Sequence, residues 1–287
     1  MLFSLKNTRI KLQILATPIG NLEEVSNRFL NALKDSECIL CEDTRIAMKL
    51  IAKFNLKNKE LICYQKFNEK KQLNLAIQKI KSQKTILISD AGYPCISDPG
   101  YLLVNECYKN GIFIEIINGP SSLVHSLTVS GLNLNNFYFN GFLPSNKKQR
   151  IFRLKDLIEI NKKNPIVFFE SVHRIKESLK DMFLIFNNPF FVVCRELTKI
   201  NETIYRGHYE EIINEITTKG EFVVIVDSHV KDQIKPKLFT NQEIINMIDE
   251  TISNTKEISL KNACKIISSK IKMSASLIYN IYIKNKC

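Results

Sequence analysis

Four polar segments of the sequence follow apolar runs and carry side chains that can bind ligands or move protons. They cover residues 42–45, 89–100, 170–174 and 195–203. Their carboxylates can accept protons, or hydrogen bonds from hydroxyl and amino groups, and their arginines and lysines attract phosphate. These residue types indicate a site that holds a polar ligand near an acid or a base.

Segment 89–100 is the most informative of the four, because it holds two aspartates, two glycines and two prolines in twelve residues. This composition predicts an irregular, closely packed loop. Asp98, followed by Pro99, is typical of the start of a helix. Asp90 has no such structural duty, so we expect it to accept hydrogen bonds from a ligand.

Structural interpretations stay open for the other segments. Asp43 or Thr44 can cap a helix, whereas Glu42 and Arg45 are less needed for capping, and the guanidinium of Arg45 suits phosphate. His173 alone is typical of a helix start, but the ionisable groups that accompany it exceed what capping requires. Those groups are Glu170, Arg174, Arg195, Glu196 and Lys199.

Strands and helices are expected to alternate in both halves of the chain. The expected strands are 12–16, 37–41, 61–64, 85–89, 112–117, 137–142, 166–169, 191–195 and 222–226. The expected helices are 22–34, 44–53, 69–83, 101–110, 121–130, 147–162, 174–186 and 209–217. Because parallel strands need a crossover, this alternation indicates a largely parallel sheet, whose ligands bind at the carboxyl ends of the strands.

Gly119-Pro120 is expected to separate two α/β lobes, residues 10–118 and 119–227. The polar segment 228–239 suits a linker, and the tail, residues 237–287, is expected to form a small helical module with helices at 241–254, 260–270 and 274–284. The tail is also expected to contact RNA through lysines that lie next to apolar residues. These lysines are Lys261, Lys265, Lys270 and Lys272.

The composition limits the classes of function. The chain of 287 residues has a formal charge of +12, which would attract a polyanion such as RNA, although the cations are spread along the chain. It has no apolar run near the roughly 20 residues that span a bilayer and no recognisable secretory signal, so we expect a cytoplasmic protein without a membrane partner. Cys38 and Cys41 lack a second ligand pair, so we expect reduced thiols and no metal.

Several of these segments, taken in order, resemble the ribosomal RNA small subunit methyltransferase I family, whose members methylate the 2′-oxygen of a cytidine in 16S rRNA. This family belongs to the tetrapyrrole methylase superfamily. The resemblance covers residues 10–227, and residues 258–282 are similar to the C-terminal helical module of the family. The matching segments are 17–21, 42–45, 89–100, 119–120, 141–144, 170–174, 195–203 and 219–221. Several long motifs in one order are far more specific than any one of them.

The resemblance implies two α/β lobes of tetrapyrrole methylase type, with S-adenosylmethionine bound in the cleft between them. It also implies a homodimer, no metal, and 16S rRNA or the small ribosomal subunit as partner. The residues that match cofactor contacts of the superfamily are Pro18, Asp90, Ala91, Gly92, Ile96, Ser121, Ser122, Glu170 and Leu197.

Methyl transfer to a ribose hydroxyl requires that the oxygen be positioned and then deprotonated. Glu170, His173 and Glu196 are the candidate proton acceptors, and Lys199 is a candidate for lowering the pKa of the hydroxyl. We expect Arg45, Arg174, Arg195 and Lys199 to contact RNA, because a cation repels the sulfonium of the cofactor and attracts phosphate. The sequence does not choose among these groups.

Two other functions fit part of the sequence. A methylase of a corrin or porphyrin precursor would share the fold and the cofactor, but the loop at 89–100, segment 195–203 and the basic tail resemble the RNA family more closely. An RNA-binding module without enzymatic activity would use the positive charge, but it would leave the ionisable clusters without a role.

Overall fold

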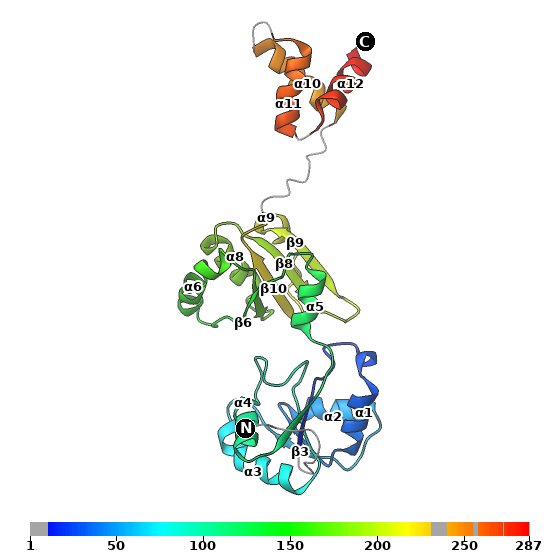
Figure 1. Ribbon diagram of the computed structural model, residues 1–287, viewed down its shortest axis with the longest axis vertical. Helices are drawn as coiled ribbons and strands as arrows, with labels where there is room; N and C mark the ends of the chain where they lie inside the picture. The colour runs from blue at the N-terminus through cyan, green and yellow to red at the C-terminus, as the bar shows by residue number, and fades with distance from the viewer. Residues whose placement is uncertain (1–10, 231–239, 255–257, 272, 287) are drawn as a thin grey trace. The chain divides into compact units, whose positions relative to one another are not determined.

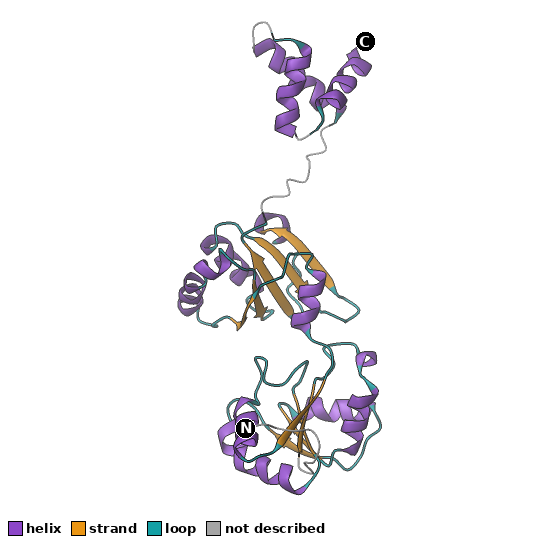
Figure 2. Cartoon of the chain, viewed as in Figure 1, coloured by secondary structure: helices purple, strands orange, loops and turns teal. Residues whose placement is uncertain are grey.

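The computed structural model describes residues 11–230, 240–254, 258–271 and 273–286. The chain divides into two compact units, Met1–His229 and Val230–Cys287. The first unit contains two five-stranded sheets with helices packed on them, and the second contains helices (Figures 1 and 2). The predicted fold class, two α/β lobes followed by a C-terminal helical module, is confirmed.

The first lobe is built on a parallel sheet with strand order β3-β2-β4-β1-β5. Its strands are β1 Lys11–Leu15, β2 Cys38–Cys41, β3 Glu60–Cys63, β4 Thr85–Ile88 and β5 Phe113–Ile117. Its helices are α1 Asn27–Asp35, α2 Thr44–Lys53, α3 Glu69–Ser82 and α4 Tyr101–Lys109. Apolar residues of α3 and α4 cover one face and those of α1 and α2 the other, which explains why β2 and β4 are apolar and buried throughout.

The parallel arrangement decides where the polar loops lie. Because all strands of the first sheet run in one direction, their carboxyl ends meet at a single edge. The loop after β2 carries Glu42, and the loop after β4 carries Asp90. These residues, 48 positions apart in the sequence, are therefore brought to the same edge: the backbone N–H of Asp43 donates to Asp90 Oδ1 at 3.1 Å.

The second lobe differs from the expected parallel sheet. Its strand order is β6-β7-β10-β8-β9, in which β6 and β7 are parallel and the other neighbours are antiparallel. The difference arises from a strand that the sequence did not indicate, β9, which follows β8 after a short connection and pairs with it as a hairpin. The strands are β6 Tyr138–Phe142, β7 Ile166–Glu170, β8 Phe190–Arg195, β9 Thr203–His208 and β10 Phe222–Asp227.

The helices of the second lobe are α5 Ser122–Val129, α6 Lys147–Asp156, α7 Ile158–Asn161, α8 Ile175–Ile185 and α9 Tyr209–Ile212. Two expected helices are interrupted. The one expected at 147–162 forms α6 and α7, and the one expected at 22–34 forms a 3-10 turn, Leu22–Glu24, followed by α1. The second interruption has a local cause, since the Ser26 hydroxyl caps the new helix by accepting from the N–H of Phe29 at 3.1 Å.

The C-terminal unit consists of α10 Asn241–Asn254, α11 Leu260–Ile271 and α12 Ala275–Lys286. These helices bury apolar side chains against one another, as their amphipathic sequence predicts. The buried cluster comprises Ile244, Ile248, Cys264, Ile267 and Ile278. The expected linker lies mostly outside the described residues, at 231–239.

Glu69 at the start of α3 joins two helices of the first lobe. Its buried carboxylate accepts from the backbone N–H of Gly100 at 2.8 Å and from that of Leu102 at 3.2 Å. These N–H groups lie at the start of α4 and have no acceptor within the helix. Glu69 thus performs the capping role that the sequence suggested for Asp98, and it fixes the end of the loop at 89–100.

Replacing Glu69 by Ala should lower the free energy of unfolding by about 1 to 3 kcal/mol, because buried N–H groups at the start of α4 lose their acceptor. Glu69→Gln keeps an acceptor oxygen and should cost less. Chemical denaturation at neutral pH measures both, with Glu215→Ala, a change at an exposed glutamate, as the control. Equal stability of Glu69→Ala and Glu215→Ala would show that this cap contributes nothing.

Candidate active site

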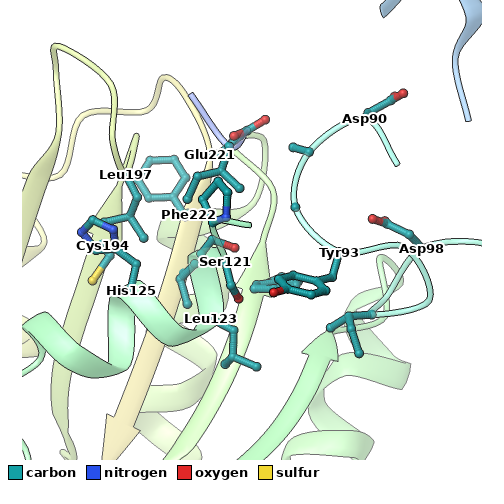
Figure 3. Close-up of a pocket in the computed structure, with 18 of the residues that line it drawn as sticks. Asp90, Tyr93, Asp98, Ser121, Leu123, His125, Cys194, Leu197, Glu221 and Phe222 are labelled. Carbon is teal, nitrogen blue, oxygen red and sulfur yellow. The ribbon is translucent and has the colours of Figure 1, made fainter. Parts of the chain in front are cut away.

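A cleft of about 1050 Å³ is lined by residues from both sheets of the first unit (Figure 3). The first lobe contributes loops that follow β1, β2 and β4, and the second contributes α5 and residues around β7, β8 and β10. In Figure 3 one loop carries Asp90, Tyr93 and Asp98, and Leu197 and Phe222 lie across from it. Such a cleft is large enough for a whole small molecule.

The loop at 89–100 is held in an unusual backbone conformation. Thr17 and Gly92 exchange two backbone hydrogen bonds, of 2.9 and 3.0 Å, which tie the loop to the end of β1. Gly92 has φ +77°, a conformation that suits glycine. Cys95 and Ser97 also have positive φ, 71° and 69°, although they carry side chains. Backbone strain of this kind is concentrated at functional sites.

The first-lobe wall of the cleft carries four carboxyl side chains, the exposed Glu24 and the partly buried Glu42, Asp90 and Asp98. Burial raises the pKa of Glu42, Asp90 and Asp98, and the neighbouring carboxylates raise it further. The pKa of Asp98 reaches about 7, because burial and the charge of Glu42 outweigh the hydrogen bond from Ser89. Asp98 can therefore exchange a proton near neutral pH.

The second-lobe wall is mainly apolar. Leu197, Phe222 and Val223 are buried and line it, together with Phe169, whose ring packs edge-on against Phe142 at 5.5 Å between centroids. An apolar wall facing carboxyl groups suits a ligand that has a flat apolar part and a cationic part.

The residues that we expected to contact the cofactor line two different cavities. Those that line the cleft are Asp90, Ala91, Gly92, Ile96, Ser121, Ser122, Glu170 and Leu197. Pro18 is outside this lining and borders a smaller cavity.

Glu170 has both carboxylate oxygens occupied. Oε1 accepts from the N–H of Ser171 and from Arg174, each at 2.7 Å, and Oε2 accepts from the hydroxyl of Ser178 at 2.6 Å. The side chain has no exposed surface. This arrangement favours a role in holding the start of α8 over a role as proton acceptor.

The remaining candidate proton acceptors, His173 and Glu196, are less suited than Asp98 to take a proton from a ligand in the cleft. His173 is exposed and is not part of the cleft lining. Burial raises the pKa of Glu196, but hydrogen bonds from Lys199 and from the N–H of Glu221 outweigh it, so that the pKa is lowered. A carboxylate with a lowered pKa is a weak base.

Lys199 lies between two carboxylates, with Nζ 2.9 Å from Glu196 Oε1 and 3.0 Å from Glu221 Oε2. Burial lowers the pKa of Lys199, but these hydrogen bonds outweigh it and the pKa is raised. The ammonium therefore stays charged. Its backbone segment is strained, since Glu196 and Thr198 have φ +53° and +65°.

The three arginines are each held by the protein. Arg45 is exposed and pairs with Asp43, with Nη2 2.6 Å from Oδ2, and this contact lowers the pKa of Asp43 to about 2. Arg174 pairs with Glu170. Arg195 donates to the backbone carbonyls of Lys219 and Asn201 at 2.6 and 3.2 Å.

Sequence reasoning missed several residues of the cleft. Asp98 was interpreted as a helix cap, but Gly100 precedes α4 and Glu69 accepts its N–H. The hydroxyl of Tyr93 accepts from the N–H of Gly119 at 3.2 Å. His125 follows Ser121 and Ser122 on α5 at helical spacing, which is the only sequence signal that could have placed it beside them.

The described residues contain no cluster of three or more His, Cys, Asp or Glu side chains placed to hold a metal ion. None of the helices that these residues form is long and apolar enough to cross a membrane.

Comparison with known proteins identifies the family. The model of the Tetrapyrrole (Corrin/Porphyrin) Methylases matches residues 11–213. The chain is 36% identical to ribosomal RNA small subunit methyltransferase I of Mycoplasma genitalium over 94% of this chain and 98% of that protein. It is 42% identical to the protein of the same name from Halalkalibacterium halodurans, over 79% of this chain and 78% of that protein.

Solved structures show the same fold at low sequence identity. A diphthine synthase is similar with a TM-score of 0.59 and 14% identity, over 76% of this chain and 90% of that one. Uroporphyrin-III C-methyl transferase from Thermus thermophilus, solved with S-adenyl homocysteine, is similar with a TM-score of 0.53 and 16% identity, over 76% and 97% of the two chains. The chain therefore belongs to the tetrapyrrole methylase family and, within it, to the ribosomal RNA small subunit methyltransferase I family that its sequence motifs resemble.

Proposed function

We propose that this protein transfers a methyl group from S-adenosylmethionine to the 2′-oxygen of a cytidine in 16S rRNA. Relatives named ribosomal RNA small subunit methyltransferase I match it at 34 to 42% identity. The observation that carries the chemistry is the pairing of a carboxyl-lined wall, with Asp98 poised near neutral pH, and an apolar wall. We further propose that it acts in the cytoplasm as a homodimer, on 16S rRNA or the small ribosomal subunit.

The residues of the cleft fit S-adenosylmethionine. This molecule supplies an activated methyl group on a sulfonium cation, and the cation and the amino group suit the carboxyl groups of Glu42 and Asp90. The adenine ring suits the apolar wall formed by Leu197 and Phe222. The related structure solved with S-adenyl homocysteine supports this choice of ligand.

Asp98 is the proton acceptor in this proposal. Its carboxyl lines the cleft, and its pKa of about 7 lets it take a proton from the acceptor hydroxyl near neutral pH. The raised pKa also means that the carboxylate form is a stronger base than an ordinary aspartate. Glu170 and Glu196 are assigned to support rather than to proton transfer, because of the contacts described above, and His173 is assigned no proton transfer because it is exposed and outside the cleft lining.

The cations separate into two groups. Arg174 and Arg195 position the loops after β7 and β8, since they bind Glu170 and backbone carbonyls of the chain itself. Lys199 and Arg45 also pair with carboxylates of the chain, but Lys199 stays charged beside the cleft and the side chain of Arg45 is 81% exposed, so we assign these two to RNA phosphates. In α11, Lys261 and Lys265 are also exposed and are assigned to RNA, whereas Lys272 lies outside the described residues.

Changing Asp98 to Asn should slow methyl transfer to small ribosomal subunits by about 10² to 10⁴-fold, the usual contribution of a general base. For the unaltered protein the single-turnover rate should rise with pH and level off above an inflection. That inflection should lie at or below about pH 7, since a bound sulfonium cation lowers the pKa of Asp98. The variant should lose the inflection.

Stability separates this role from a structural one. The folded pKa of Asp98 lies above its usual value of 3.8, so its contribution to stability is present below that value and is lost as the pH rises through about 7. Asp98→Asn should therefore not lower the melting temperature at pH 8. If the Asp98→Asn variant melted at a lower temperature than the unaltered protein at pH 8, and its rate kept the pH inflection, Asp98 would be structural.

Deleting residues 237–287 tests the tail. RNA binding should weaken, and the dependence of its logarithm on the logarithm of salt concentration should become less steep, because fewer phosphate contacts release counterions. Affinity for S-adenosylmethionine should stay unchanged, since the cleft is lined by residues of the first unit. Filter binding at several salt concentrations and calorimetry measure the two effects. An unchanged salt slope would contradict the assignment of Lys261 and Lys265 to RNA.

A further inference from the structure

A second, smaller cavity of about 180 Å³ lies in the first lobe, between α2 and the ends of β1 and β4. Pro18, Leu22, Ile46 and Leu50 give it an apolar lining. Whole small-molecule ligands occupy pockets of roughly 300 to 1000 Å³, so this cavity suits a single ring system rather than a complete cofactor. The proposed methyl transfer gives this small cavity no role.

The small cavity adjoins the cleft through one side chain. Asp90 is part of the lining of both. The loop after β1 borders both as well, since Pro18 lines the small cavity and Ile19 the cleft. A reacting group in the cleft and a neighbouring ring in the small cavity would therefore both lie beside Asp90.

Helix α2 presents a row of cations beside this cavity. Arg45, Lys49 and Lys53 are spaced four residues apart, which places them on one face of the helix, with about 6 Å of rise between successive cations. Lys49 and Lys53 also line the cavity, and neither pairs with a carboxylate of the described residues. The helix itself, Thr44–Lys53, contains no acidic residue.

From this combination we infer that the small cavity receives a nucleobase of the RNA substrate, splayed out of its stack, while Lys49 and Lys53 bind the adjoining phosphates. An apolar slot beside a row of cations matches the two chemically distinct parts of a nucleotide, a flat base and an anionic backbone. The ribose between them would lie near Asp90, at the entrance to the cleft. This inference rests on the proposed function, since it names the substrate part that the cavity holds.

Substitutions in α2 test the inference with a matched control. Ile46 lines the cavity and is 40% exposed, whereas Met48 on the same helix is 53% exposed and is not part of the lining. Ile46→Trp should fill the cavity and raise KM for small ribosomal subunits at least tenfold, with affinity for S-adenosylmethionine changed less than twofold. Met48→Trp should leave KM within twofold of that of the unaltered protein.

Charge reversal tests the phosphate contacts. Lys49→Glu with Lys53→Glu should raise KM at least tenfold and reduce the salt dependence of RNA binding. Lys180→Glu, at an exposed lysine of α8, is the control and should do neither. Equal kinetics for the Ile46 and Met48 variants, or for the two sets of charge reversals, would overturn the inference.

A photoreactive benzoylphenylalanine at position 46 identifies the occupant directly. Irradiation with small ribosomal subunits should cross-link it to RNA at the methylated nucleotide or its immediate neighbour. A cross-link to a second copy of this chain or to a ribosomal protein would show that α2 is a protein interface. If the unaltered protein transfers no methyl group to the subunit, the proposed function itself fails. If it does, and the cross-link lies elsewhere, only the nucleobase assignment fails.

Discussion

The first-lobe wall of the cleft brings together three partly buried carboxyl groups, and the free-energy cost of ionising all three is the constraint on which the site depends. Burial and mutual repulsion raise the pKa values of Glu42, Asp90 and Asp98. No arginine or lysine is part of the cleft lining in the described residues, and the N–H of Asp43 and the charge of Arg45 offset the raised pKa of Asp90 only in part. A ligand with a positive charge would relieve the repulsion, which links the binding of a sulfonium cation to the ionisation of Asp98.

The rest of the first unit holds these groups in place. The parallel sheet brings the loops after β2 and β4 to one edge, and the backbone bridge between Thr17 and Gly92 ties the second loop to β1. Glu69 fixes its far end through the N–H of Gly100. In the second lobe, Glu196, Lys199 and Glu221 form a charged contact that holds a strained turn next to the apolar wall. Rigid loops of this kind reduce the reorganisation needed when a ligand binds.

Local sequence patterns were enough to predict much of the fold. The apolar runs gave β2 and β4 within one residue at each end, and helix α2 and helix α10 begin and end where their spacing predicts. The antiparallel order of the second sheet was missed, because strand pairing depends on contacts between distant residues and β9 lies beside a polar motif. The place of Asp98 in the cleft wall was missed for a similar reason: the acceptor for the N–H groups at the start of α4 is Glu69, which is 31 residues from Gly100.

The candidate site, like the fold, could be predicted from the sequence only in part. The residues near the cleft could be named from motifs, but their roles depend on partners that a sequence does not show. Glu170 and Arg174 occupy each other, and Lys199 lies between two carboxylates. The choice of proton acceptor therefore had to wait for burial and charge, which distinguish Asp98 from Glu196.

The most direct measurement of the central claim is the fate of a labelled methyl group. The purified protein would be incubated with S-adenosylmethionine labelled in the methyl group and with small ribosomal subunits that lack the modification, and the RNA would then be digested to nucleosides. We expect the label in 2′-O-methylcytidine from a single position of 16S rRNA, and none in a parallel reaction with a porphyrin precursor. Label in the porphyrin precursor, or on a base of the RNA, would contradict the proposed function.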